Sequence, residues 1–193
     1  TTPQVFAESV SFANFGANLT LGSMTGAILT GAITPPGTVY AFGNGGGVLI
    51  LRGGAALTDA SGGGSRSLSV VSSSTIQDNA LAVVLQAANS FSGGVRVANS
   101  LLLLDAAGAL PPGSRPMSLE AGAYLGFTET AGMSGPGGFR SMLSPSNFSS
   151  LTLDPTAVLG LDSTQFIAGK IENSDSSPTV ARFVSDKLDF SQL

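Results

Sequence analysis

The sequence contains no cysteine, no histidine and no tryptophan. The absence of cysteine excludes a disulfide scaffold and thiolate metal sites. Without histidine the chain cannot form a Ser-His-Asp triad, a Cys-His dyad or an imidazole zinc site. The composition therefore excludes several common hydrolytic and zinc-dependent chemistries, and we predict no catalytic residue, no cofactor and no metal site.

Charge is also scarce. Charged residues make up 10% of the chain, whereas an ordinary soluble domain carries about 25%. The net charge is −4, and the eight Lys and Arg residues are scattered singly. Because no basic stripe exists, nucleic acid and anionic membrane surfaces are not expected partners.

Long apolar segments are missing too. No run reaches the ~18 apolar residues that a transmembrane helix needs, so no membrane span is predicted. The opening ten residues lack a basic region followed by an apolar one, which predicts no signal peptide. On this basis the chain is either a mature product or an excised segment.

Glycine and short apolar runs are abundant instead. The chain has 26 glycines and a hydrophobic fraction of 42%. Runs of four to six apolar residues alternate with Gly, Ser, Asn, Asp and Pro turn signals, a pattern typical of an all-β protein. The expected strands are residues 5–12, 18–21, 27–30, 38–42, 47–51, 67–71, 81–85, 94–97, 101–104, 117–119, 123–127, 150–153, 158–161 and 179–183.

A convincing amphipathic helix is hard to find. The best candidate, residues 75–88, is rich in Val and Leu, and we interpret it as two strand pieces. Parallel strands that are not joined by helices need another kind of crossover connection. A single-stranded parallel β-helix supplies it through short turns, with about 20–25 residues in each coil.

Side-chain alternation fits that fold in two places. Val95 and Val97 are predicted to face the core while Arg96 points outward, and Leu68 and Val70 face inward between outward serines. The run at residues 101–104 is Leu-Leu-Leu-Leu, so its outward pair needs a cover from a loop, a neighbouring chain or a cap.

Residues 88–114 carry the most specific pattern. Residues 89–94 read Asn-Ser-Phe-Ser-Gly-Gly, residues 95–97 and 100–103 form two strands, and residues 107–113 form a small-residue turn. This order resembles the autotransporter-associated β-strand repeat, also called the passenger-associated transport repeat, of bacterial surface proteins. The chain departs from that repeat at Val95, where Thr is usual, and at Asn99 and Pro111, where Gly is common. Asn99 can still adopt the positive φ of a glycine turn.

The resemblance implies a right-handed parallel β-helix within a secreted or surface-displayed passenger, whose repeats assist export and build a stalk. It implies one β-helix domain over residues 1–193. Residues 1–37 would form N-terminal rungs or a cap, residues 38–144 the repeat-bearing rungs, and residues 145–193 divergent rungs or a C-terminal cap. No series of ~10-residue lipid-facing strands closes the chain.

Paired carboxylates are the first alternative chemistry, because two of them can hydrolyse a glycosidic bond on a β-helix. Glu120 and Glu129 form one candidate pair, and Asp154 and Asp162 form the other. We interpret all four as solvated acids. A polysaccharide lyase would need clustered Asp and a basic group, whereas Arg96 and Arg140 stand alone in the sequence.

Other patterns have structural explanations. The glycine runs at residues 43–47 and 62–64 lack the Asp of calcium-binding repeats and the Lys of a phosphate loop, so they predict turns. Residues 52–54 (Arg-Gly-Gly) also predict a turn, and the sequons at Asn18 and Asn147 are interpreted as incidental. We expect the phenylalanines to stack inside the rungs, with a sugar-binding groove as the alternative.

The sequence thus predicts a non-enzymatic, adhesin-like structural segment at the bacterial cell surface or in the secreted fraction. Its expected partners are a host surface, a glycan or a neighbouring surface protein. Outer-membrane secretion machinery, or the barrel of the same parent chain, is expected to export it. Two alternatives stay open, namely a carbohydrate-active β-helix enzyme and a self-associating surface fibre.

Overall fold

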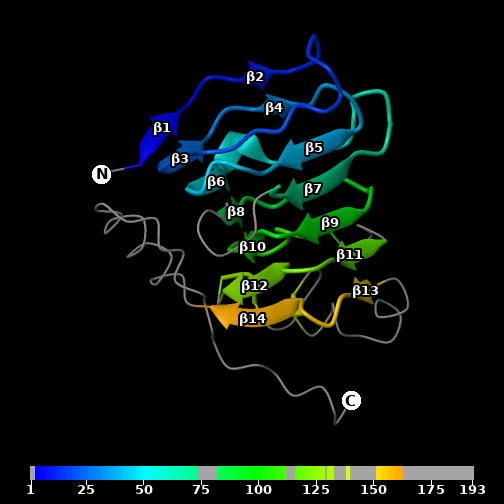
Figure 1. The fold of residues 1–193 in the computed structure, drawn as a ribbon. Helices are drawn as coiled ribbons and strands as arrows, with labels where there is room; N and C mark the ends of the chain where they lie inside the picture. The colour runs from blue at the N-terminus through cyan, green and yellow to red at the C-terminus, as the bar shows by residue number, and fades with distance from the viewer. Residues whose placement is uncertain are drawn as a thin grey trace.

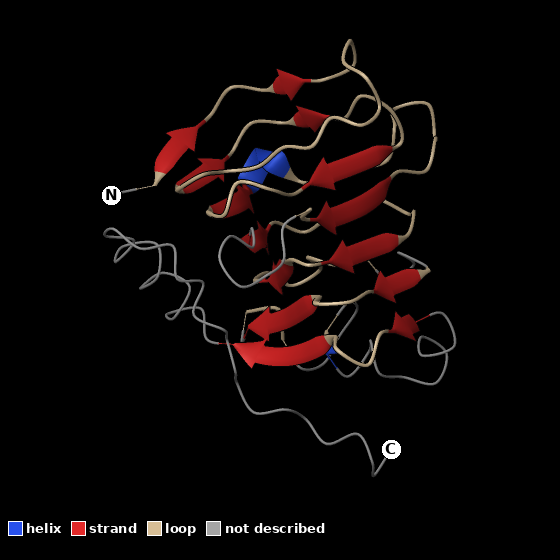
Figure 2. Ribbon diagram, viewed as in Figure 1, coloured by secondary structure: helices blue, strands red, loops and turns tan. Residues whose placement is uncertain are grey.

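The computed structural model describes residues 3–73, 82–111, 116–128, 130–132, 138–139 and 151–162. These residues are almost entirely β-structure, with the 3-10 helix η1 (Gly53–Ala55) as a short helical turn. Figure 2 shows strands and loops making up nearly all of the coloured chain. The all-β prediction is therefore confirmed.

The larger sheet has seven strands, and every pairing in it is parallel. Its strands, in spatial order, are β1 (Gln4–Phe6), β3 (Gly26–Leu29), β6 (Val48–Arg52), β8 (Ala82–Gln86), β10 (Leu101–Leu104), β12 (Tyr124–Thr128) and β14 (Val158–Asp162). Spatial order follows chain order, so each later strand adds to the same growing edge.

A second sheet of five strands is also wholly parallel. It contains β5 (Val39–Phe42), β7 (Ser67–Val71), β9 (Val95–Ala98), β11 (Met117–Leu119) and β13 (Leu151–Leu153). A further parallel pair joins β2 (Val10–Ser11) to β4 (Ile33–Thr34). Figure 1 shows β1 and β2 at one end of the molecule and β13 and β14 at the other.

From β5 onward the chain alternates between the two sheets. We call a rung the segment that gives one strand to each sheet, such as β9 with β10. Leu101 pairs with Ala82, 19 positions earlier, and with Tyr124, 23 positions later. Those spacings are near the predicted 20–25 residues, whereas Tyr124 pairs with Val158, 34 positions later. The parallel pairing of the strands is therefore kept even where the connection between them is longer.

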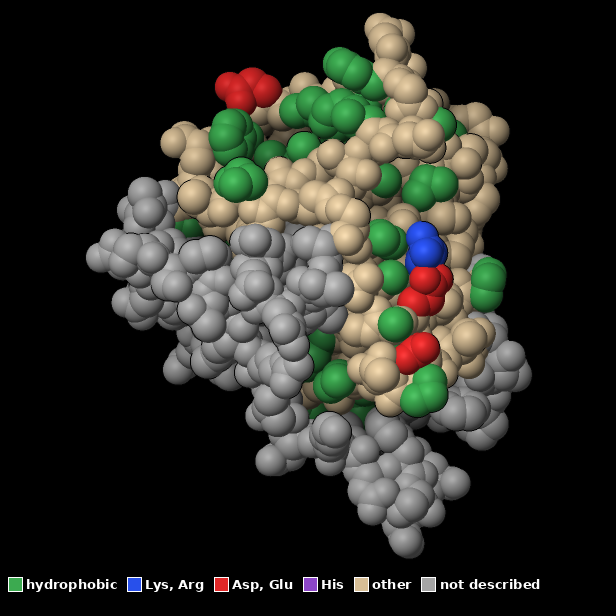
Figure 3. Space-filling view, viewed as in Figure 1, with side chains coloured by type: hydrophobic (Ala, Val, Ile, Leu, Met, Phe, Trp, Pro, Cys, Tyr) green, Lys and Arg blue, Asp and Glu red, His purple; other side chains and the backbone are tan. Residues whose placement is uncertain are grey.

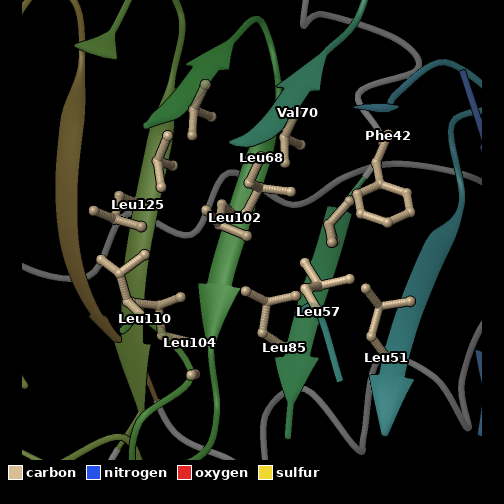
Figure 4. Close-up of a cluster of buried hydrophobic side chains, with 14 of the residues drawn as sticks. Phe42, Leu51, Leu57, Leu68, Val70, Leu85, Leu102, Leu104, Leu110 and Leu125 are labelled. Carbon is tan, nitrogen blue, oxygen red and sulfur yellow. The ribbon is translucent and has the colours of Figure 1, made fainter. Parts of the chain in front are cut away.

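The space between the two sheets holds the main hydrophobic cluster. Parallel register stacks inward side chains in columns that cross the strands, because each residue lies beside its register partner. One column runs through Leu51, Leu85, Leu104 and Phe127, all at most 2% exposed. Figure 4 shows Leu57 and Leu110, from connections between strands, beside this column, and Leu68 of the five-stranded sheet beside Leu102. Each fully buried leucine contributes roughly 1.5–3 kcal/mol.

The alternation predicted for the five-stranded sheet is confirmed. Val95 and Val97 are at most 2% exposed, whereas Arg96 between them is exposed. Leu68 and Val70 are likewise buried in β7. Asn99 has a φ of 46°, so it makes the left-handed turn that the sequence assigned to it.

The outer face of the seven-stranded sheet is apolar as well. Leu101 and Leu103 are 4% and 1% exposed and pack in a second cluster with Ile50, Val84 and Tyr124. Both faces of β10 are thus buried, as its uninterrupted leucines predict.

Tyr124 explains a glycine on this outer face. A Cβ added at Gly160 would overlap the Tyr124 hydroxyl and ring, so the ring occupies the volume of the missing side chain. The glycine and the tyrosine lie on adjacent strands, β14 and β12.

Some strand predictions are wrong in detail. The expected strand at residues 5–12 is split, because the chain leaves β1 after Phe6 and re-enters a different sheet as β2. In the expected strand at 18–21, only Leu21 forms a bridge, to Phe42. The two-residue strand β4 was not predicted, and the expected strand at 179–183 lies outside the described residues.

Within the described residues, no helix is long and apolar enough to cross a membrane.

Candidate functional site

The segment with the repeat-like pattern forms a corner followed by two buried strands. Phe91 is 1% exposed, and the chain turns at Gly93 and Gly94 before it enters β9. A Cβ at Gly93 would overlap the backbone of Arg66, and one at Gly94 would lie 2.6 Å from the carbonyl oxygen of Pro116. Both glycines are therefore required by the close approach of the neighbouring rungs.

Asn89 joins three successive connections through its side-chain amide. Its Oδ1 accepts a hydrogen bond from the backbone N–H of Leu57 at 2.7 Å, and its Nδ2 donates to the carbonyl of Ala109. Its own N–H donates to the carbonyl of Gly108 at 2.9 Å. We call this arrangement the Asn89 clamp. It satisfies backbone groups in chain segments 32 positions before and 20 positions after Asn89.

A second set of polar contacts lies beside the clamp. The Asp59 carboxylate accepts hydrogen bonds from the backbone N–H groups of Arg66 at 2.8 Å and Ser92 at 3.0 Å. The hydrogen bond from the Ser92 side chain is the largest influence that lowers the pKa of Asp59, followed by the backbone bonds. Ser92 and Ser65 also share a hydroxyl contact of 3.1 Å.

Arg66 and Tyr40 complete this group. The Arg66 guanidinium donates to the Tyr40 hydroxyl at 3.1 Å and lies 5.5 Å from the centre of the tyrosine ring. Tyr40 in turn donates to the carbonyl of Thr58 at 2.9 Å. Asp59 is a weak base because its pKa is lowered, so the group ties loops to neighbouring rungs and is poorly suited to activating a serine.

A polar ladder follows the carboxyl ends of the seven-stranded sheet. Arg52 donates to Gln86 at 2.8 Å, and Gln86 donates to Asp105 at 2.7 Å. The Thr128 hydroxyl then donates to the other carboxylate oxygen of Asp105 at 2.6 Å. Asp105 is 4% exposed and Thr128 is 3% exposed. The ladder therefore gives a buried carboxylate partners on the strands at either side.

The structure describes the side chain of one member of each candidate acid pair, Glu120 and Asp154. Glu120 lies beside Arg96, with both carboxylate oxygens bonded at 2.6 and 2.7 Å. The prediction that Arg96 stands alone is therefore wrong, because its partner is 24 positions later and on the next strand of the sheet. Glu129, Arg140 and the Asp162 side chain lie outside the described residues.

Register places Glu120 next to Asp154 instead. Leu119 pairs with Leu153, and the N–H of Asp154 donates to the carbonyl of Leu119. Arg96 lowers the pKa of Glu120, chiefly through its hydrogen bonds, and the hydroxyl and N–H of Thr156 lower the pKa of Asp154. Glycoside hydrolysis needs one carboxyl group with a raised pKa as the acid. The pKa values of Glu120 and Asp154 are both lowered, so neither carboxyl group meets this requirement.

The glycine runs are turns, as predicted. Asn44, Gly45 and Gly46 all have positive φ, and Gly63 has a φ of 81° with Ala60 bonded to Gly64 across the turn. Arg52 precedes η1 and reaches Gln86 on the next strand. Asn18 is exposed, and Asn147 lies outside the described residues.

Four of the described phenylalanines are interior. Phe42, Phe91, Phe127 and Phe139 are at most 6% exposed, and the last two meet edge to face with ring centres 5.2 Å apart. Phe148 lies outside the described residues. One pocket near the first rungs, lined by Phe12, Leu21 and Pro36 among others, has a volume of about 10 Å³. That is room for about one water, and so too small for a sugar.

Among the described residues, no group of three or more Asp, Glu, His or Cys side chains could hold a metal ion. Comparison with known proteins finds no matching family model, no matching curated protein and no matching solved structure.

Proposed function

We propose that this chain is a non-enzymatic structural segment that builds a stalk or display scaffold in a secreted or surface-exposed bacterial passenger protein. Its architecture would be a single-stranded right-handed parallel β-helix, since parallel strands joined by a crossover are almost always right-handed. The observation that carries the proposal is the Asn89 clamp, in which the first residue of the repeat-like motif bonds to both neighbouring connections.

The surface of the five-stranded sheet supports the same role. Ser69, Arg96, Ser118 and Thr152 form one outward column in register, so hydroxyl groups cover most of it. The single cation in that column is held by Glu120. A neutral hydroxyl surface over a filled apolar core suits a spacer that must stay soluble while it extends another domain.

Export offers a direct test of this proposal. The chain would be fused between a bacterial signal peptide and an outer-membrane translocation barrel, and its exposure measured by adding protease to intact cells. We expect the wild-type segment to reach the surface in a protease-resistant form. Leu102→Asp, which places a charge at a fully buried position, should reach the surface in a protease-sensitive form or remain inside.

Retention of the wild-type segment in the periplasm would contradict an exported stalk. Release of reducing ends from a panel of bacterial and host polysaccharides, lost in Glu120→Gln, would instead establish the carbohydrate-active alternative. Glu120 is the right residue for that control because backbone register places it next to Asp154.

A further inference from the structure

The turn between β13 and β14 contains a peptide bond of a type that is sensitive to acid. Asp154 is followed by Pro155, and this is the only Asp-Pro pair in the sequence. The proline nitrogen belongs to a tertiary amide and carries no N–H. It is more basic than an ordinary peptide nitrogen, so it takes up a proton and departs more readily. The aspartate carboxylate can reach its own main-chain carbonyl carbon, because attack there closes a five-membered ring.

Hydrogen bonds within the turn hold both reacting groups. Oδ1 of Asp154 accepts hydrogen bonds from the N–H of Thr156 at 2.8 Å and from the Thr156 hydroxyl at 2.6 Å. Because both bonds end on Oδ1, we assign Oδ2 as the attacking oxygen. The main-chain carbonyl oxygen of Asp154 accepts a hydrogen bond from the N–H of Ala157 at 2.9 Å. That donor polarises the carbonyl and stabilises the negative charge that attack places on its oxygen.

The preceding rung anchors the turn at two points. The N–H of Asp154 donates to the carbonyl of Leu119 at 2.8 Å. The N–H of Gly122 donates to Oγ1 of Thr156 at 3.1 Å, and the proton of that hydroxyl is directed to Asp154. The folded chain therefore prearranges the two reacting groups, whereas an unfolded chain must find the same geometry among many others.

Solvent reaches this turn, and the charges beside it are paired. Pro155 and Thr156 are exposed, and Figure 3 shows acidic side chains at the surface over β11 and β13. The charged groups that the described residues place beside Asp154 are Glu120, next in register, and Arg96, which binds Glu120. The Thr156 hydroxyl is the largest influence that lowers the pKa of Asp154. The carboxylate nucleophile therefore persists in acid that protonates an ordinary aspartate.

We propose that the bond between Asp154 and Pro155 is an acid-dependent self-cleavage site, with the Asp154 carboxylate as the nucleophile. Its oxygen forms a bond to the main-chain carbonyl carbon of Asp154, which closes a cyclic anhydride. The bond from that carbon to the Pro155 nitrogen breaks, and the nitrogen leaves with a proton taken from hydronium. Water then hydrolyses the anhydride, so the sum is hydrolysis of one peptide bond. The cleavage is independent of the proposed stalk function.

Incubation of the full 193-residue chain in buffers from about pH 3 to 6 tests the proposal. Since β14 pairs with β12 along its length, the pieces should stay associated, so products are measured by denaturing electrophoresis and intact mass. The new chain should begin at Pro155. Its rate of appearance should rise as the pH falls and level off below the pKa of Asp154. Circular dichroism at each pH identifies the range in which the chain is folded.

Three variants separate the roles of the residues in the turn. Asp154→Glu keeps the charge but must close a larger ring, and Pro155→Ala keeps the nucleophile but has a less basic leaving nitrogen. Each should slow cleavage by about tenfold or more. Thr156→Val removes the hydroxyl that lowers the pKa of Asp154, so its rate should level off at a higher pH. The bond after Asp59 is an internal control, because that carboxylate also has a lowered pKa but is followed by alanine.

Unfolding tests whether the fold contributes. In concentrated urea at the same pH, cleavage should be slower by about tenfold or more, because the contacts from the preceding rung are lost. The proposal is overturned if this bond is cut only where circular dichroism shows unfolding, if urea leaves the rate unchanged, or if Asp154→Glu is cut as fast as the wild type.

Discussion

The centre of the strand stack and its N-terminal end are buried very differently. Leu104 in β10 and Phe6 in β1 continue the same inward column, yet Leu104 is fully buried and Phe6 is 44% exposed. Leu104 has a register partner on both sides, whereas among the described residues Phe6 pairs with Leu29 alone. In this fold, burial depends on adjacent rungs as much as on the hydrophobicity of a strand itself.

The largest expected effect follows from that column. Leu85→Ala should lower the free energy of unfolding by about 2–5 kcal/mol, because it leaves a cavity between Leu51 and Leu104. Phe6→Ala, in the same column, should cost less than about 1 kcal/mol because the ring is already half in water. Urea denaturation would measure both. Equal costs would contradict the dependence on neighbouring rungs.

Glycine substitutions should differ in cost according to what surrounds the added methyl group. Gly160→Ala should cost about 1–3 kcal/mol, because the added methyl group overlaps Tyr124. In a Tyr124→Leu background the cost should fall by half or more, which a double-mutant cycle would detect. Gly37→Ala is the control near the N-terminal end, since nothing lies within 4 Å of its added Cβ. A similar loss at both glycines would show that overlap with Tyr124 does not govern the effect, since chain entropy alone favours alanine.

The Asn89 clamp should matter more than a polar contact nearer the N-terminal end. Asn89→Ala should cost about 1–3 kcal/mol, because the partly buried N–H of Leu57 and carbonyl of Ala109 lose their partner. Asn44 also bonds to a neighbouring rung, through Ser73, but it is exposed and has a φ of 58°. Glycine adopts a positive φ readily, so Asn44→Gly keeps the backbone conformation. Thermal unfolding should therefore show a smaller loss of stability for Asn44→Gly than for Asn89→Ala.

The smallest effect is expected at the exposed ion pair. Arg96→Ala should cost no more than about 1 kcal/mol, because solvent screens its pairing with Glu120. The pKa of Glu120 is lowered from its ordinary 4.5, so protonation favours the unfolded chain. Its contribution is complete above that pH and is lost as the pH falls through the lowered pKa. Acid titration of stability should therefore be shallower in Glu120→Gln, whereas an unchanged titration would exclude this pair as a source of acid sensitivity.

Local sequence was enough to locate much of the β-structure. Strands β7, β10 and β11 have the bounds expected from apolar alternation and turn residues, and Asn99 has the positive φ expected of a glycine substitute. The split between β1 and β2 was missed because residues 5–12 contain no strong turn signal. The strand β4 was missed because it is only two residues long and ends directly before the Pro35-Pro36 pair.

The polar contacts could not be predicted in the same way. Asn89 was recognised as the start of a motif, but its partners Leu57 and Ala109 lie in other rungs, and rung length varies from 19 to 34 positions. For Glu120 we considered the acid nearest in sequence, whereas register selects Arg96 and Asp154. Sequence distance identifies neighbours along a strand, but the number of residues in each connection determines neighbours across strands.

The two tyrosines lie in separate hydrophobic clusters, Tyr40 between the sheets and Tyr124 on the outer face. Because the chain has no tryptophan, ultraviolet emission from the folded protein comes from these two rings. Replacing either ring with phenylalanine leaves a single intrinsic fluorophore. In Tyr40→Phe the remaining ring, Tyr124, would report on the part of the stack near β12. In Tyr124→Phe the remaining ring, Tyr40, would report on the part near β5. The molecule thus carries a native optical label in each of two regions, with which the order of their unfolding can be followed.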